Sequence, residues 1–313
     1  MRYSTLKNSD LNVSVIGLGT NAVDGHNLFE NLNEEDGREL IRAALNNGVN
    51  FIDTADVYGF GRSEELVGEV LKEYKRDDFV IATKGGRQRF SDGTVKANTR
   101  PEYLREALEK SLQRLQLDEI DLYYIHFPDS VTPFSESVGE LARLKKEGKI
   151  RAIGISNVSF EQLKEANAHG DISVLQSAYH MLDRSAEAEL LPYCVENNIS
   201  FIPYGPLAFG FLGGGFTKEF KLDPQDWRNS VPLFQGERFQ QTLETVEKLK
   251  DIATKKVTTL PNLALAWLLA QEGVDVVIPG GKKKERILEN VHASEIKFTK
   301  EELDTINRIL AGK

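Results

Sequence analysis

Short apolar runs alternate with amphipathic segments along most of the chain. Eight mostly apolar runs recur between residues 13 and 281. They are VSVIGLG (13–19), NFIDTA (50–55), FVIATK (79–84), IDLYYIHF (120–127), IRAIGIS (150–156), VLQSAY (174–179), SFIPYGP (200–206) and VVIPGG (276–281). Near-continuous apolar runs of this length are typical of buried strands in a parallel sheet that helices cover.

The segments between these runs have the periodicity of amphipathic helices. Several end at Gly or Asn before the next run, as in NNGV, KEGK and ENNI, which is typical of helix C-termini. The helical segments cover residues 34–46, 62–74, 101–115, 134–147, 159–168 and 186–197. Eight strand-and-helix units predict the α/β class and a (β/α)8 TIM barrel.

Three segments exceed this repeat. The first residues contain YSTLKNSDLNV, which predicts a β-hairpin that turns at KNSD and caps the bottom of the barrel. A Gly-rich loop at 207–235 follows the seventh strand, and loops this long are usually functional. An extra C-terminal helix is expected near 300–310.

The glycines of the first run raise a competing fold. GLGTNA (17–22) matches the G-x-G-x-x-G/A pattern of dinucleotide-binding folds, which is a weak signal on its own. That pattern needs a helix that opens on the glycines and an acid about 20 residues later. Here the loop VDGHNLFENLN follows, and Asp53 lies well beyond that spacing from Gly19. We therefore reject the doubly wound fold.

Composition limits the partners and the compartment. The chain has 313 residues, no Pro/Gly/Ser-rich linker and a net charge of −9. We expect one domain over 1–313, and the negative charge disfavours nucleic acid and anionic membranes as partners. One cysteine excludes an internal disulfide, and neither a secretory signal nor an apolar run of ~18 residues is found. These features predict a cytoplasmic protein. The five histidines and the cysteine are scattered, so no metal is expected.

Polar residues stand at the ends of the predicted strands. Asp53 lies near the end of the second strand and Tyr58 just beyond it. Lys84 ends the third strand, and His126 lies at the end of the fourth. The C-terminal ends of the strands carry the active site of a TIM barrel. Taken singly, a helix cap, a solvated lysine or a core histidine is the commoner interpretation. Together, an acid, a phenol, an amine and an imidazole on neighbouring strand ends form a proton-transfer set.

The chemistry of this set suits protonation of an oxyanion. A phenol with a pKa near ~10 donates a proton sluggishly at neutral pH. An ammonium group ~4 Å away would stabilise the phenolate by up to about 4 kcal/mol at an effective dielectric constant of ~20, and so would lower the pKa of Tyr58. Asp53 would keep Lys84 charged, and His126 could orient a carbonyl oxygen. The set therefore fits the addition of hydride to a carbonyl group.

A collinear set of motifs runs through almost the whole chain. It comprises GLGT, FIDTADVYGFGRSEELVGEVL, VIATK, IDLYYIHFPD, IGISN, LQSAY, YGPL and IPGGKKKERILEN. On these motifs the sequence resembles the aldo-keto reductases, and it is most similar to the bacterial branch with stress-induced and inositol-operon reductases. The resemblance implies an NADPH-dependent reductase of aldehydes and ketones. By this resemblance Tyr58 would be the proton donor, Lys84 and Asp53 would adjust the pKa of Tyr58, and His126 would orient the carbonyl group.

The resemblance also implies which residues hold NADPH or NADP+. Ser156, Asn157 and Gln176 would hold the nicotinamide carboxamide, Tyr204 would stack on the nicotinamide ring, and the loop at 207–235 would form a lid over the cofactor. The implied cofactor contacts are Gly19, Thr20, Asn21, Asp53, Ser156, Asn157, Gln176, Tyr204, Gly205, Pro206, Leu207, Gly210, Leu212, Gly280, Gly281, Lys282, Arg286, Glu289 and Asn290.

The sequence departs from the family pattern at the adenosine end of this site. Many members carry Lys-Ser against the 2′-phosphate, where this chain has Gly280 and Gly281, followed by Lys282. Arg286 is in place, so the phosphate contacts are rearranged and the strength of the NADPH preference is open.

Two other functions compete with a reductase. The chain could be a regulatory subunit or redox sensor of the same fold that binds cofactor and turns over slowly. It could also be a Schiff-base aldolase that uses Lys84, which is disfavoured because a charged lysine is a poor nucleophile. For the reductase we expect a small aldehyde or ketone as the partner and a monomeric protein.

Overall fold

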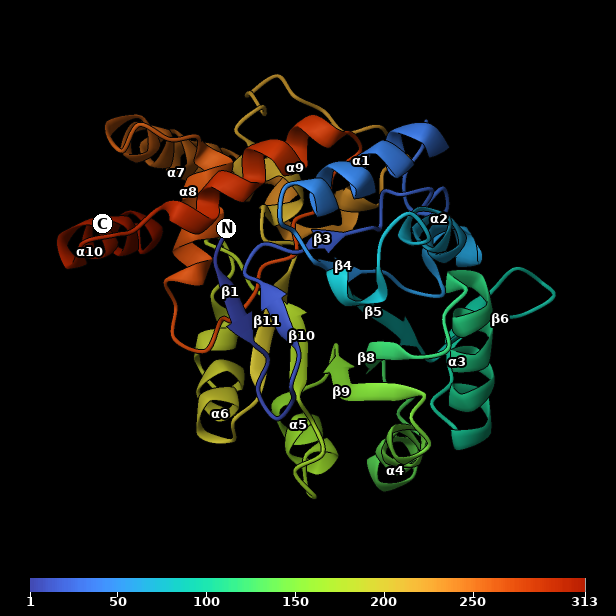
Figure 1. Ribbon diagram of the computed structural model, residues 1–313. Helices are drawn as coiled ribbons and strands as arrows, with labels where there is room; N and C mark the ends of the chain where they lie inside the picture. The colour runs from blue at the N-terminus through green and yellow to red at the C-terminus, as the bar shows by residue number, and fades with distance from the viewer. Residues whose placement is uncertain (313) are drawn as a thin grey trace.

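The computed structural model describes residues 1–312, and its centre is a parallel sheet curled into a barrel (Figure 1). Seven strands run in the order β11-β10-β9-β8-β5-β4-β3, and each neighbouring pair is parallel. Their bounds are Leu18–Gly19 (β3), Phe51–Asp53 (β4), Val80–Gly85 (β5), Ile120–Ile125 (β8), Ile150–Ser156 (β9), Val174–Ala178 (β10) and Ser200–Tyr204 (β11). The predicted α/β barrel is confirmed.

Isolated backbone bridges close the barrel between its two edge strands. Residues 274–280 bridge to Phe201 of β11 on one side and to Ile16 and Gly19 on the other, all in the parallel sense. The sequence predicts a full strand at 276–281, but the described chain forms no regular strand there. Pro279 has no N–H group to donate, so a continuous ladder cannot form through it.

The predicted first strand at 13–19 is divided between two sheets. Its start, Asn12–Ser14 (β2), pairs antiparallel with Tyr3–Thr5 (β1), and only Leu18–Gly19 joins the barrel sheet as β3. The predicted N-terminal hairpin is thus present. Its turn contains Asn8 with φ of 49°, a left-handed conformation that asparagine tolerates well.

Helices surround the sheet and pack on their neighbours in chain order (Figure 1). The sequence places seven of them to within a few residues, although α2, α5 and α6 are shorter than predicted. The helix α7 was not predicted, and it packs against the predicted C-terminal helix α10. The bounds are Glu34–Asn46 (α1), Arg62–Leu71 (α2), Pro101–Leu115 (α3), Phe134–Lys146 (α4), Phe160–Ala166 (α5), Leu190–Glu196 (α6), Gly236–Lys255 (α7), Leu260–Leu269 (α8), Lys284–Asn290 (α9) and Lys300–Leu310 (α10).

The buried apolar side chains form two separate clusters. The larger cluster lies between the strands and the surrounding helices, and the smaller one fills the barrel interior. Leu6, Leu11 and Val13 of the N-terminal hairpin belong to the interior cluster, together with strand residues such as Phe51 and Val80. All five side chains are at most 8% exposed. The hairpin therefore closes one end of the barrel with apolar side chains, as the sequence predicts.

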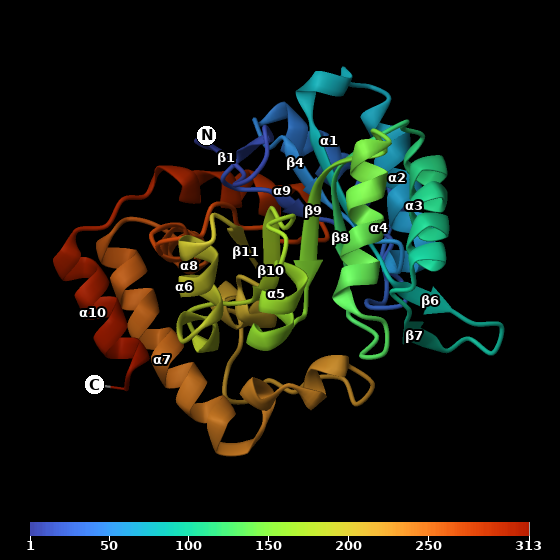
Figure 2. The ribbon, with the colours of Figure 1, turned by 90° about the horizontal axis from the view of Figure 1, so that it is seen from below.

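The opposite end of the barrel carries the long connections (Figure 2). A hairpin that was not predicted, β6 (Arg87–Arg89) with β7 (Val95–Ala97), follows β5 there. The loop at 207–235 contains three short 3-10 turns: η4 (Ala208–Gly213), η5 (Trp227–Ser230) and η6 (Pro232–Phe234). None of the helices within residues 1–312 combines the length and the apolar character that a bilayer crossing requires.

Candidate active site

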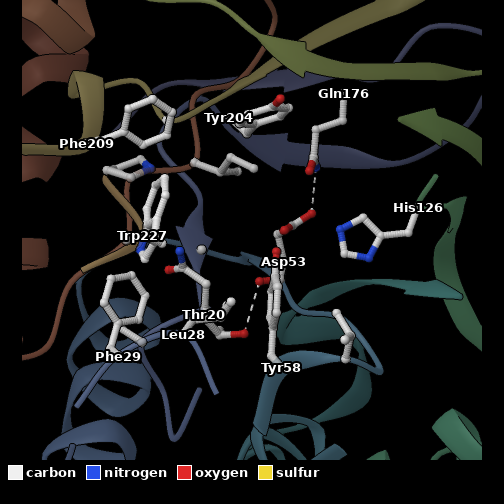
Figure 3. A pocket seen from close by; sticks show the side chains of 18 of the residues that line it. Thr20, Leu28, Phe29, Asp53, Tyr58, His126, Gln176, Tyr204, Phe209 and Trp227 are labelled. Atoms are coloured by element: carbon white, nitrogen blue, oxygen red, sulfur yellow. Dashed lines mark hydrogen bonds between the residues drawn. The ribbon is translucent and has the colours of Figure 1, made fainter. Parts of the chain in front are cut away.

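A cavity of about 870 Å³ opens at the C-terminal ends of the strands. This volume lies in the range of small-molecule and cofactor sites, ~300–1,000 Å³. Figure 3 shows His126 and Gln176 on one side, the aromatic side chains of Phe209 and Trp227 on the other, and Asp53 between them. The cavity wall thus combines strand-end polar groups with loop aromatics.

Asp53 and Lys84 form a buried ion pair beneath the cavity. The side chain of Lys84 is 0% exposed and that of Asp53 is 3% exposed, and their Nζ and Oδ1 atoms are 2.5 Å apart. Lys84 also donates to the carbonyl oxygen of Thr54 at 2.8 Å, and Gln176 Nε2 donates to Asp53 Oδ2 at 2.9 Å. Burial alone would lower the pKa of Lys84, but Asp53 and then Tyr58 outweigh it and raise that pKa. The lysine is therefore a cation at neutral pH.

Tyr58 begins the 3-10 turn η1 (Tyr58–Gly61), in the connection that follows β4. Lys84 Nζ lies 5.3 Å from the centre of its ring. The prediction that Lys84 lowers the pKa of Tyr58 is wrong in its net effect. Removal of the phenol from water raises its pKa, and the attraction of Lys84 only partly opposes that. Tyr58 is therefore protonated at neutral pH and can act as a proton donor.

His126 follows β8 directly and faces Tyr58. The two rings meet edge to face, with centroids 6.1 Å apart and an angle of 86°. Burial, reinforced by the charges of Lys84 and Arg87, lowers the pKa of His126 well below its usual value. Its Nδ1 atom is buried and has no hydrogen-bond partner within the described residues. The site thus presents a neutral imidazole with hydrogen-bonding capacity to spare.

Asn157 links three strand ends around the cavity. It follows β9 with φ of 56°, and its Nδ2 donates to His126 O at 3.0 Å and to Ser156 Oγ at 2.9 Å. Its Oδ1 accepts from Tyr204 OH at 3.0 Å. These bonds tie the backbone of His126 and the hydroxyl of Tyr204 to Asn157. That Asn157 also holds a carboxamide stays a prediction.

The structure brings most of the predicted site residues to one cavity. Lys84 lies just behind the wall, which includes the other three members of the catalytic set. The predicted cofactor contacts on this wall are Gly19, Thr20, Asn21, Asp53, Ser156, Asn157, Gln176, Tyr204, Gly205, Pro206, Leu207, Gly210, Gly280, Gly281 and Lys282. The cavity wall does not include Leu212, Arg286, Glu289 or Asn290.

The local structure explains why these four predicted cofactor contacts do not line the cavity. Leu212 is 0% exposed and packs in the outer core, because η4 turns its side chain inward. Arg286 has a 67% exposed side chain that reaches Glu289 at 3.4 Å. Asn290 is buried at the end of α9. Of the basic residues around this helix, Lys282 is the one on the cavity wall, and its Nζ donates to Glu30 O at 3.3 Å.

Sequence reasoning missed three polar residues of the cavity wall: Asn27, Arg87 and Arg228. Asn27 donates to Val57 O at 3.0 Å and accepts from Gly59 N at 2.8 Å, so it holds the backbone on both sides of Tyr58. Arg87 lies on the cavity wall, on the β6 strand that was not predicted. Asn27 falls in a loop without periodicity, and nothing in its sequence context marks it as a brace. Within residues 1–312 no group of three or more His, Cys, Asp or Glu side chains could hold a metal ion.

Comparison with known proteins gives a consistent result. The model of the Aldo/keto reductase family matches residues 15–311. The chain is 37% identical over 312 residues to the aldo-keto reductase YhdN of Bacillus subtilis strain 168, covering 99% of this chain and 94% of that one. It is 36% identical over 312 residues to the NADH-specific methylglyoxal reductase of Escherichia coli K12, covering 96% of this chain and 95% of the relative.

A solved structure supports the same assignment at the level of the fold. The glycerol dehydrogenase of Gluconobacter oxydans superposes with a TM-score of 0.93 at 33% sequence identity, covering 99% of this chain and 95% of that one.

Proposed function

The chain belongs to the aldo/keto reductase family, and we propose that it reduces aldehyde or ketone carbonyls to alcohols with NADPH, with Tyr58 as the proton donor. Membership supports an oxidoreductase that acts on carbonyl groups. One observation carries the finer proposal: a protonated Tyr58 and a neutral His126 face one cavity, above the buried Asp53–Lys84 pair.

The cavity fits a nicotinamide cofactor in size and in lining. Glycines on its wall admit close approach, and at Gly280 a Cβ atom would lie only 2.8 Å from Asn21 Oδ1. Gln176 Nε2 is engaged by Asp53, so its Oε1 is left to accept from a carboxamide. Tyr204 and Ser156 would complete the nicotinamide site, and Lys282 with the glycines would hold the phosphate groups. When bound, the reduced cofactor supplies the hydride.

The residues of this chain supply alignment and the proton. His126 can donate a hydrogen bond to the carbonyl oxygen and so direct it toward Tyr58. The phenol of Tyr58 passes its proton to that oxygen as negative charge develops there. The phenolate left behind is stabilised by the Lys84 cation, which Asp53 Oδ1 and Thr54 O hold in place.

The proposal is tested by NADPH consumption against a panel of aldehydes, ketones and polyol-derived carbonyl compounds. We expect turnover of several panel members together with saturable cofactor binding. Tight cofactor binding without any turnover would instead indicate a regulatory subunit. A borohydride-trapped substrate adduct on Lys84 would indicate an aldolase.

Cofactor choice gives a second prediction. If Lys282 binds the 2′-phosphate, Lys282→Ala should weaken NADPH binding by about tenfold to a hundredfold. That is the loss of affinity expected when one hydrogen bond to a charged group is removed. Arg286→Ala should have a smaller effect, because Arg286 is exposed and contacts Glu289. NADH binding should change little in either variant. Dissociation constants at fixed salt check this.

The matched control is Lys283→Ala, which removes an equal charge one residue away from the cavity wall. Equal losses for NADPH and NADH would show that Lys282 does not distinguish the two cofactors. A parent protein that binds NADH more tightly than NADPH would match the Escherichia coli relative, which is named as NADH-specific.

Asn27 gives a prediction about positioning. Asn27→Ala removes both backbone contacts beside Tyr58, so the turn should sample more conformations, and kcat should fall severalfold with cofactor binding unchanged. Asn27→Asp is the matched variant: it retains the acceptor for Gly59 N and loses the donor to Val57 O, and an intermediate kcat is expected. Steady-state kinetics at saturating cofactor measure this. An unchanged kcat in Asn27→Ala would show that the turn keeps its geometry without the Asn27 side chain.

A further inference from the structure

Arg87 places a cation beside the residues proposed for catalysis. It lies on the cavity wall, and its guanidinium carbon is 4.8 Å from the centre of the Phe127 ring. The Phe127 and His126 rings are themselves 5.0 Å apart between centroids. These two separations set an upper limit of about 10 Å between the Arg87 guanidinium and the imidazole of His126. A small molecule held at His126 can therefore also reach Arg87.

The charge of Arg87 has no counter-ion within the described residues. The Nε atom of Arg87 is buried and has no hydrogen-bond partner there. By contrast Arg228, which also lines the cavity, pairs with Asp226 at 2.6 Å. The acid on the wall, Asp53, is already occupied by Lys84 and Gln176. A partly buried guanidinium without an anion is unfavourable, so the site is incomplete without one.

Asp56, the acid near Arg87, does not fill this role. Its Oδ1 atom is buried and makes no hydrogen bond in residues 1–312. Burial, followed by repulsion from Glu64, raises the pKa of Asp56 well above its usual value, and the nearby cations Arg114 and Arg87 only partly oppose this. The charged form of this carboxyl group is therefore disfavoured, and no ion pair joins Asp56 to Arg87 within the described residues. Glu64 itself is engaged by Arg114 at 2.6 Å.

We propose that the substrate is a short carbonyl compound that carries a carboxylate, which Arg87 binds while the carbonyl group lies at Tyr58 and His126. This inference rests on the proposed reductase function. Arginine presents a planar fork that matches a carboxylate with two parallel hydrogen bonds. A phosphate group would bring more negative charge than one guanidinium neutralises, so a monoanion is the better match. The upper limit of about 10 Å to His126 indicates a chain of few carbon atoms between the two groups.

The competing interpretation is structural. Arg87 could simply stack on Phe127, since a guanidinium over an aromatic face is stabilising by itself. In that case neutral and anionic substrates would be treated alike, which the experiment measures directly.

The test compares two ketones of the same shape, 4-oxopentanoate and 5-methylhexan-2-one, in which an isopropyl group replaces the carboxylate. Their binding to the protein, free and with oxidised cofactor, is followed by calorimetry at fixed salt. We expect Arg87→Met to weaken 4-oxopentanoate binding by about tenfold to a hundredfold relative to its effect on the neutral ketone. Arg87→Lys keeps the charge without the fork and should lose less. Arg89→Met, on the exposed part of the same hairpin, should leave the ratio unchanged.

The outcomes separate this inference from the proposed function, because NADPH turnover of both ketones is measured independently. Turnover of the neutral ketone with an affinity ratio that Arg87→Met does not change would overturn the carboxylate site and leave the reductase intact. Absence of all turnover with an Arg87-dependent ratio would overturn the reductase and leave the anion site standing. A ratio that falls equally in Arg89→Met would also overturn the inference, because it would show a general charge effect.

Discussion

Replacement of Tyr58 by phenylalanine should lower kcat for carbonyl reduction by about 10²- to 10⁴-fold, the usual loss when a general acid is removed. The ring and its packing remain, so cofactor affinity should hardly change. The reason lies in the site: Tyr58 shares the cavity with His126 and has Lys84 Nζ 5.3 Å from its ring. Single-turnover reduction and cofactor titration of the variant measure the two quantities separately.

Tyr124 offers a matched control for the same chemical change. Its ring lies 5.7 Å from Lys84 Nζ, and its buried hydroxyl has no hydrogen-bond partner within residues 1–312. It does not line the cavity. Tyr124→Phe should therefore retain turnover. A Tyr58→Phe variant with near-normal kcat would show that the proton comes from another group, and His126, whose ring faces Tyr58, would be the next candidate.

The same assignment predicts the pH dependence of reduction in the parent protein. Burial raises the pKa of Tyr58 above its ordinary value of 10.0. The phenol therefore carries its proton throughout the neutral range, and its contribution to the rate should be lost only at a higher pH. His126 is held neutral by its lowered pKa, so no rate change near pH 6.5 is expected from it. A rate that falls between pH 6 and 8 would contradict both assignments.

Strand-end residues could be predicted from the sequence because their position follows from chain order. Once eight buried runs are identified, the C-terminal end of each run faces the same side of the barrel. Asp53, Lys84 and His126 were located in this way, and the structure brings them together around Tyr58. The interior packing of the N-terminal hairpin was likewise predictable, because its apolar residues need a surface to cover.

The loop residues could not be predicted, because their directions depend on contacts distant in sequence. Asn27 reaches across to Val57 and Gly59, about 30 residues away, with no periodic signal. Leu212 was expected at the cofactor and turns into the outer core instead. The direction of the pKa shift of Tyr58 could not be predicted either. The sequence identifies Lys84 as a neighbour of Tyr58, but only the structure shows that burial raises this pKa by more than Lys84 lowers it.

Removal of Lys84 should be the most destabilising single change at this site. Lys84→Met leaves the Asp53 carboxylate 3% exposed without its cation, although Gln176 still donates to it. Loss of one partner of a buried ion pair costs about 3–5 kcal/mol of unfolding free energy, because the other charge stays buried and unpaired. Denaturant unfolding of the two proteins at neutral pH measures the difference.

A double-mutant cycle shows whether the unpaired charge is the cause. Lys84→Met leaves the Asp53 carboxylate buried without a cation, and Asp53→Asn removes that negative charge. The double variant should therefore be more stable than the sum of the two single losses predicts. Additive losses would show that the lysine contributes through packing alone, and the ion pair would then be no part of the explanation.

The pH dependence of this loss has a definite sign. The pKa of Lys84 is raised in the folded protein above the ordinary value of 10.5. A group with a raised pKa contributes stability that is fully present below its unfolded pKa and is lost as the pH rises through the folded one. The difference in unfolding free energy between the parent and Lys84→Met should therefore stay constant from pH 7 to about 10, and should shrink only above that. A difference that already shrinks between pH 7 and 9 would mean that Lys84 loses its proton near neutrality, and it could then not serve as the fixed cation beside Tyr58.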